Sequence, residues 1–81
     1  MPVKPLRLSL QDYLKKHQLV RKFEKQVEIF EQNPRHRSLN TELLEPKSAG
    51  IYSFRIDRKY RAIFIIVDSQ AEVIDINSHY Q

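Results

Sequence analysis

The stretch IYSFRIDRKYRAIFIIVDSQAEVIDIN, residues 51–77, decides the fold that this sequence predicts. It contains three apolar segments, at 51–57, 60–67 and 71–77, separated by only two and three residues. Such short connections join neighbouring strands, so the segments predict an antiparallel meander. The segment 60–67 is apolar on both faces, which is typical of the central strand of a sheet.

The first of these segments alternates between apolar and polar residues, as a strand with one buried face does. Its apolar face carries Tyr52, Phe54 and Ile56. If a two-residue loop sets Asp57 opposite Tyr60, then Arg61 lies on that same aromatic face. The same register predicts that Arg55 points to the opposite face, where its aliphatic stem can cover apolar surface.

The region before these strands has apolar residues at helical spacing. They are Leu19, Phe23, Val27 and Phe30. Two interpretations fit the spacing: a helical hairpin with a break near His17–Gln18, or one continuous helix over 10–32. Asn33-Pro34 predicts the end of the helical region, because the residue before proline is disfavoured in the α conformation.

At the N-terminus, Leu6, Leu8 and Leu10 alternate with polar residues and predict a short strand. Ser9 and Asp12 follow the pattern of a helix N-cap and an acidic first turn. Residues 35–50 have no regular pattern and predict a loop. We expect three leucines of this loop to anchor it in the core, namely Leu39, Leu43 and Leu44.

These elements predict one α+β domain over residues 1–81, in the order β-α-α-β-β-β. A helix or helical hairpin would pack on one face of a small antiparallel sheet. The chain has no cysteine and one glycine, which excludes disulfides, thiolate zinc sites and glycine-rich phosphate loops. Its longest apolar run, 62–67, is far shorter than the roughly 20 residues of a membrane span. We therefore expect a cytoplasmic protein.

The charge is concentrated in the first half of the chain. The net charge is +4, and residues 1–40 hold nine Lys/Arg against four Asp/Glu. Such a basic bias favours a polyanion or an acidic protein as partner. The three histidines lie far apart, at positions that do not suggest a shared metal, so no metal or cofactor is expected.

Two residues at the predicted sheet stand out for phosphate chemistry. Arg61 begins the central strand, and an arginine there can bind a phosphate through two hydrogen bonds. His79 follows the last strand, and a histidine titrates near neutral pH and can act as general acid or base. Glu42 and Glu45 lie in the loop before the sheet, and either could approach the strand face. Neither has a partner fixed by spacing.

Four segments in this order resemble the RelE/ParE superfamily, the RelE/YoeB-like toxins of bacterial type II toxin–antitoxin modules. They are Asn33-Pro34 running to Ser38-Leu39, the strand 51–57, the strand start Tyr60-Arg61-Ala62-Ile63-Phe64, and the last strand 73–76 leading to His79-Tyr80. The resemblance implies a microbial-ribonuclease-type fold. It also implies a ribosome-dependent mRNA endoribonuclease that needs no metal and inhibits translation.

By the same resemblance, Arg61 would stabilise the phosphate and His79 would be the acid or base. Tyr80 would stack on a base or assist proton transfer, and no general base is assigned. We expect further RNA contacts from six residues near these positions. They are Arg35, His36, Arg37, Tyr52, Arg55 and Lys59.

The resemblance also implies partners and alternatives. The expected partners are mRNA, the ribosome and a cognate acidic antitoxin, with no membrane and no small-molecule cofactor. One alternative is a ParE-like toxin that binds DNA gyrase. Another is an inactive member of the same fold that only binds an antitoxin.

Overall fold

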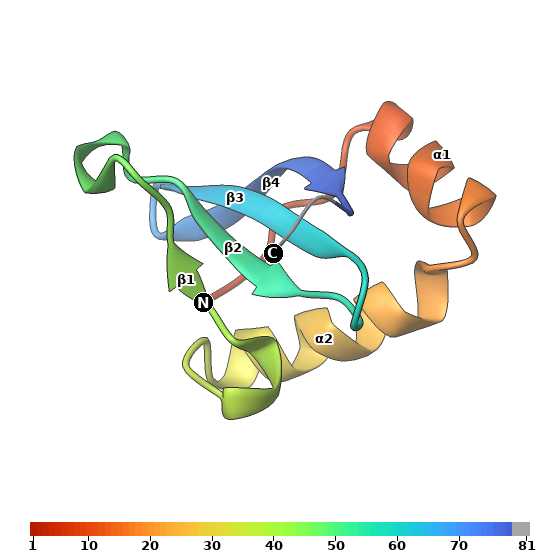
Figure 1. Ribbon diagram of the computed structural model, residues 1–81, viewed down its shortest axis with the longest axis horizontal. Coiled ribbons are helices and arrows are strands. Elements are labelled where there is room, and N and C mark those ends of the chain that lie inside the picture. The colour runs from red at the N-terminus through yellow and green to blue at the C-terminus, as the bar shows by residue number, and fades with distance from the viewer. Residues whose placement is uncertain (79–81) are drawn as a thin grey trace.

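The computed structural model describes residues 1–78 and shows a helical hairpin followed by a four-stranded sheet (Figure 1). The helices are α1 (Leu8–Lys16) and α2 (Val20–Gln32), with short 3-10 helices η1 (Arg37–Leu39) and η2 (Lys47–Ala49). The strands are β1 (Glu42–Leu43), β2 (Tyr52–Arg55), β3 (Arg61–Val67) and β4 (Gln70–Asn77). The sheet is antiparallel in the order β1-β2-β3-β4, so the predicted α+β class and meander are confirmed.

The helical region is a hairpin, which excludes the continuous-helix interpretation. Gln18 has φ 57°, a left-handed conformation that no α-helix continues through. The chain then closes the turn with a hydrogen bond of 2.8 Å from the Leu19 amide to the Leu14 carbonyl. Asn33 ends α2 in an extended conformation, as the following proline predicts.

The N-terminal strand predicted from alternating leucines is wrong. Leu8 begins α1 and is 73% exposed, so the alternation does not mark a buried face. Only Val3 bridges the sheet, in a parallel pair with Ala71. The cap prediction is also wrong, because Arg7 is the N-cap residue and the Ser9 hydroxyl accepts from Arg7 Nε at 3.0 Å.

A bulge between β2 and β3 corrects the predicted register. The amides of Ile56 and Asp57 both donate to the Tyr60 carbonyl, at 2.9 and 3.3 Å, so two residues oppose one. The extra residue places Arg55 opposite Arg61, on the same face of the sheet. The prediction that Arg61 shares a face with Tyr52 and Phe54 is therefore wrong. The prediction that Arg55 and Arg61 lie on opposite faces is wrong for the same reason.

One face of the sheet packs on α2 and forms the core; we call it the helix face and the opposite one the far face. Phe30 of α2 lies 5.2 Å, between ring centroids, from both Phe54 and Phe64. Leu39 is completely buried beneath the loop, as expected. Leu43 instead lies in β1 and is 39% exposed, so its expected place in the core is wrong, while Leu44 is half-buried.

Candidate functional site

The sheet separates the predicted site residues into two groups. Cross-strand partners project to the same face, so the pairs Arg55–Arg61 and Glu42–Ser53 lie on the far face. A cleft of about 190 Å³ opens there, which we call the basic cleft. It is lined by Asn40, Glu42, Arg55, Asp57, Arg58, Lys59 and Arg61.

Arg61 is held in a fixed position at this cleft. Its side chain is buried, with the residue only 5% exposed. Its Nε donates to the Ser53 hydroxyl at 3.0 Å, and its Nη2 donates to the carbonyls of Ser53, at 3.3 Å, and of Asn40. These acceptors fix the guanidinium plane, so the cation needs little reorganisation to meet an anion.

Glu42 is one of two carboxylates, with Asp57 of the β2–β3 turn, that line the cleft together with Arg61. It sits in β1 opposite Ser53, whose side chain binds Arg61, and it lines the same cleft. Asn40 Nδ2 donates to its Oε2 at 3.4 Å. Glu45 is exposed beyond the end of β1 and does not line the cleft. The sequence alone did not distinguish Glu42 from Glu45, because a strand of two residues is too short to show alternation of apolar and polar side chains.

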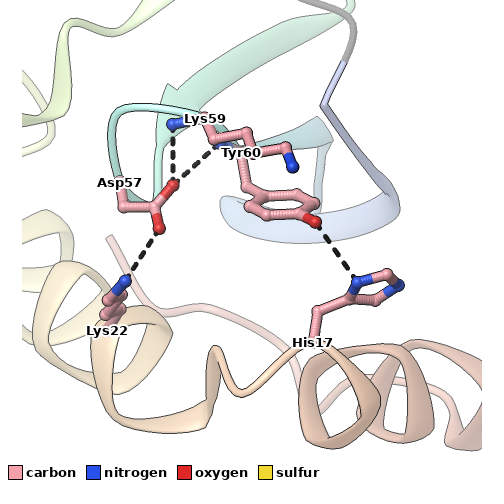
Figure 2. A network of polar contacts seen from close by, with 5 residues as sticks. All are labelled: His17, Lys22, Asp57, Lys59 and Tyr60. Atoms are coloured by element: carbon pink, nitrogen blue, oxygen red, sulfur yellow. Dashed lines mark hydrogen bonds and ion pairs between the residues drawn. The ribbon is translucent and has the colours of Figure 1, made fainter.

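The turn between β2 and β3 brings two more cations, Arg58 and Lys59, into the cleft. Asp57 shapes this turn: its Oδ1 accepts from the amides of Lys59 and Tyr60, both at 2.8 Å (Figure 2). Its Oδ2 accepts from Lys22 of α2 at 3.1 Å, which joins the turn to the helical hairpin. Burial alone would raise the pKa of Asp57, but the two amides and Lys22 outweigh it and lower the pKa.

A second contact holds the same turn from α1. The Tyr60 hydroxyl and His17 Nδ1 are 3.2 Å apart and share a hydrogen bond (Figure 2). Tyr13 lies against His17, with ring centroids 4.2 Å apart. Burial raises the pKa of the Tyr13 hydroxyl, and the neighbouring Tyr60 and Asp75 raise it further. The two helices of the hairpin thus hold the β2–β3 turn in place, although none of their residues lines the basic cleft.

The other predicted RNA-contact residues line a second hollow. Arg35, His36, Arg37 and Tyr52 lie around a groove of about 730 Å³, and Tyr52 belongs to the helix face. His36 Nδ1 accepts from the Ser38 amide at 3.1 Å and so caps η1. The structure therefore does not bring these four residues together with Arg55, Lys59 and Arg61.

The two remaining candidates, His79 and Tyr80, lie outside the described residues. The described chain does show where β4 ends. Its last residue, Asn77, pairs directly with Arg61. Within residues 1–78, no group of three or more His, Cys, Asp or Glu side chains is placed to hold a metal ion. In the same range, no helix is long and apolar enough to span a bilayer.

Comparisons with known proteins match this chain at the level of structure. No protein-family model and no curated protein sequence matches it. A solved structure described as a YoeB/ParE toxin from Agrobacterium tumefaciens superposes with a TM-score of 0.71. The match covers 99% of this chain and 100% of that one, at 24% sequence identity. The chain has the YoeB/ParE toxin fold.

Two structures from Staphylococcus aureus share the YoeB/ParE fold with this chain. A YoeB dimer superposes with a TM-score of 0.67, and a heterotetrameric YoeB–YefM toxin–antitoxin complex with a TM-score of 0.65. Each is 20% identical and covers 98% of this chain and 94% of its own. The expected fold class is thereby confirmed from an independent direction.

Proposed function

We propose that this chain is the toxin of a type II toxin–antitoxin module and cleaves mRNA on the ribosome without a metal ion. The observation that carries the proposal is the basic cleft. Within it, a buried arginine is fixed by Ser53 and Asn40 beside the carboxylate of Glu42. The YoeB/ParE fold supports the same function, because other proteins of this fold are described as toxins.

The proposed reaction is attack of a ribose 2′-hydroxyl on the adjacent phosphate. The new P–O2′ bond replaces the P–O5′ bond and leaves a cyclic phosphate on one RNA fragment. Glu42 takes the proton from the 2′-hydroxyl, and Arg61 stabilises the charge that develops on phosphate. His79 gives a proton to the departing 5′-oxygen, and Tyr80 stacks on a base or assists that transfer.

The surroundings of the cleft support these roles. Arg55, Arg58 and Lys59 line it and would hold the phosphates on either side of the cleaved bond. The pairing of Asn77 with Arg61 supports the role of His79, which follows Asn77 by two positions in the sequence. An acidic antitoxin is the proposed inhibitor, by analogy with the YoeB–YefM complex.

Substitution of the proposed catalytic residues tests this function. We expect R61A, E42Q and H79A each to abolish growth inhibition on induction. Each should slow transcript cleavage by roughly 100-fold or more, because each removes a group that acts in the transition state. The matched control is R21A, which removes an exposed arginine from α2. Primer extension on induced transcripts measures the cleavage, and circular dichroism checks folding.

The outcomes separate the candidate functions. If both R61A and H79A still inhibit growth, the proposed ribonuclease mechanism is wrong. DNA-damage induction without transcript cuts would favour gyrase binding instead. A wild-type chain that is harmless when expressed alone would favour an inactive protein that only binds an antitoxin.

A further inference from the structure

A groove lies on the helix face of the sheet, and several of the residues that line it are apolar. Leu43 of β1, Tyr52 of β2, and Phe64 and Ile66 of β3 contribute apolar side chains to the lining, and Arg35, His36 and Arg37 contribute basic ones. Tyr52 and Phe64 stack with centroids 5.4 Å apart and ring planes 18° from parallel. We call this hollow, of about 730 Å³, the apolar groove.

The groove exists because α2 stops short of this corner of the sheet. Phe30, in the last turn of α2, reaches Phe64, but the helix ends at Gln32 and Asn33-Pro34 turns the chain away. The strands continue past that point (Figure 1). Leu43 and Ile66 are consequently 39% and 44% exposed, although they belong to the face that elsewhere forms the core. Neighbouring exposed apolar side chains of this kind mark interaction surfaces.

The charges around the groove specify what kind of partner fits. The basic side chains of Arg35 and Arg37 lie beside it, together with His36, and none of the residues that line it is acidic. All three are exposed, so they are accessible to a partner from solvent. An anionic partner is therefore favoured electrostatically.

The aliphatic side chains in the groove lining favour a protein partner over RNA. Aliphatic side chains such as Leu43 and Ile66 gain stability by losing contact with water, which apolar side chains of a peptide provide. RNA bases can stack on an aromatic ring such as that of Tyr52, but neither the bases nor the sugar-phosphate backbone cover aliphatic side chains as apolar peptide side chains do. The far face already presents the cleft that is polar and cationic. The two hollows thus suit two different ligands.

We propose that the apolar groove is the docking surface for a segment of a partner protein in which apolar side chains alternate with Asp or Glu. The segment's apolar side chains cover Leu43, Tyr52 and Ile66, and its carboxylates pair with Arg35 and Arg37. This proposal rests on the proposed function for the identity of the partner, an antitoxin. The further claim is that the antitoxin binds the helix face of the sheet, opposite the basic cleft.

A phage-displayed library of random linear peptides, selected on the purified full chain, tests the docking surface. We expect the enriched peptides to combine apolar and acidic residues. Their dissociation constants should rise about 10-fold or more for the double variant L43S/I66S, because buried apolar anchors dominate such interfaces. The charge-reversed double variant R35E/R37E should weaken the same peptides independently.

Two controls match these variants. L8S removes a leucine that is 73% exposed on α1, away from the groove, and should leave peptide binding unchanged. R58A/K59A removes two cations from the basic cleft and should also leave it unchanged. Transcript cleavage should survive L43S/I66S, which separates this proposal from the ribonuclease proposal.

Three outcomes would overturn the docking proposal. One is a selection that enriches no peptide, and another is enriched peptides whose binding ignores L43S/I66S. The third is loss of affinity for a single-stranded RNA oligonucleotide that is as large for the charge-matched variant R35A/R37A as for R58A/K59A. That result would make the groove an RNA surface, as first expected for Arg35, His36, Arg37 and Tyr52. None of these outcomes bears on whether R61A abolishes cleavage.

Discussion

Gln26 is a buried polar side chain that ties α2 to the strand carrying the site. Its Nε2 donates to the carbonyl of Arg55 at 2.7 Å and to that of Ser38 at 3.3 Å. Replacement by leucine keeps the size but leaves both carbonyls without this donor. We expect Q26L to lower the free energy of unfolding by about 1–3 kcal/mol, because unsatisfied buried groups are costly. Urea denaturation measures this loss.

The exposed Glu24 on the same helix provides the control for Gln26. E24A should change the free energy of unfolding by less than about 0.5 kcal/mol. Alanine and leucine favour the helix at least as well as the residues they replace, so a loss of equal size in E24A and Q26L would contradict the hydrogen-bond explanation. The sequence carried a signal for Gln26, since it is three residues after Phe23 and four before Phe30, on the apolar stripe of α2.

Single residues also show where sequence reasoning ends. Arg61 was identifiable, because an arginine that begins a buried strand is unusual. Its face was not, because one extra residue in a bulge reverses every side chain that follows. The bulge depends on two amides sharing the Tyr60 carbonyl, and no residue type in the sequence predicts that hydrogen-bond pattern. Glu42 needed the fold, since only strand pairing sets it opposite Ser53, whose hydroxyl accepts from Arg61.

At the scale of elements, the turn between β2 and β3 is stabilised by a charge. Because the pKa of Asp57 is lowered in the folded chain, its stabilisation is complete above the unfolded pKa of 3.8. It is lost as the pH falls through the lower folded value. D57N removes the charge, so wild type should melt at a higher temperature than D57N at neutral pH. The difference should shrink on acidification below about pH 4.

Thermal unfolding of both proteins across this pH range checks the role of Asp57. D12N is the control, because Asp12 is an exposed carboxylate on α1. At neutral pH, D12N should melt at the same temperature as wild type, because it removes a carboxylate at an exposed position without a hydrogen bond to the turn. A difference between wild type and D57N that stays constant with pH would mean that the carboxylate charge contributes nothing to the turn.

The elements differ in how well the sequence predicts them. Long strands and α2 follow from sustained apolar periodicity and from the proline after Asn33. The short strand β1 does not, because two residues show no period, and it was expected to be loop. Yet β1 with the two residues before it lies between the two hollows: Asn40 lines both, Glu42 lines the cleft and Leu43 the groove. The least predictable element thus carries much of the site.

At the scale of the whole molecule, the sheet divides the binding surface. Its far face holds the basic cleft and its helix face the apolar groove, so the net charge of +4 does not act as one uniform surface. The sequence predicted the charge and the anionic partners, but it could not assign each cation to a face. That assignment depends on where α2 ends and on the register of β2 with β3.

The division predicts how RNA binding responds to salt. Each phosphate contact with a single strand contributes about −0.7 to the slope of log affinity against log salt. We expect R58A/K59A to weaken binding of a single-stranded RNA oligonucleotide and to make this slope shallower by about 1.4. Fluorescence anisotropy between about 50 and 200 mM salt measures both quantities.

The double variant K15A/K16A is the matched control, because it removes the same charge from exposed positions at the end of α1. Neither lysine lines the cleft, so the salt slope should stay at the wild-type value. Equal changes in both double variants would mean that RNA responds to net charge alone. A change confined to R58A/K59A would place the bound phosphates beside Arg61, where the proposed cleavage requires them.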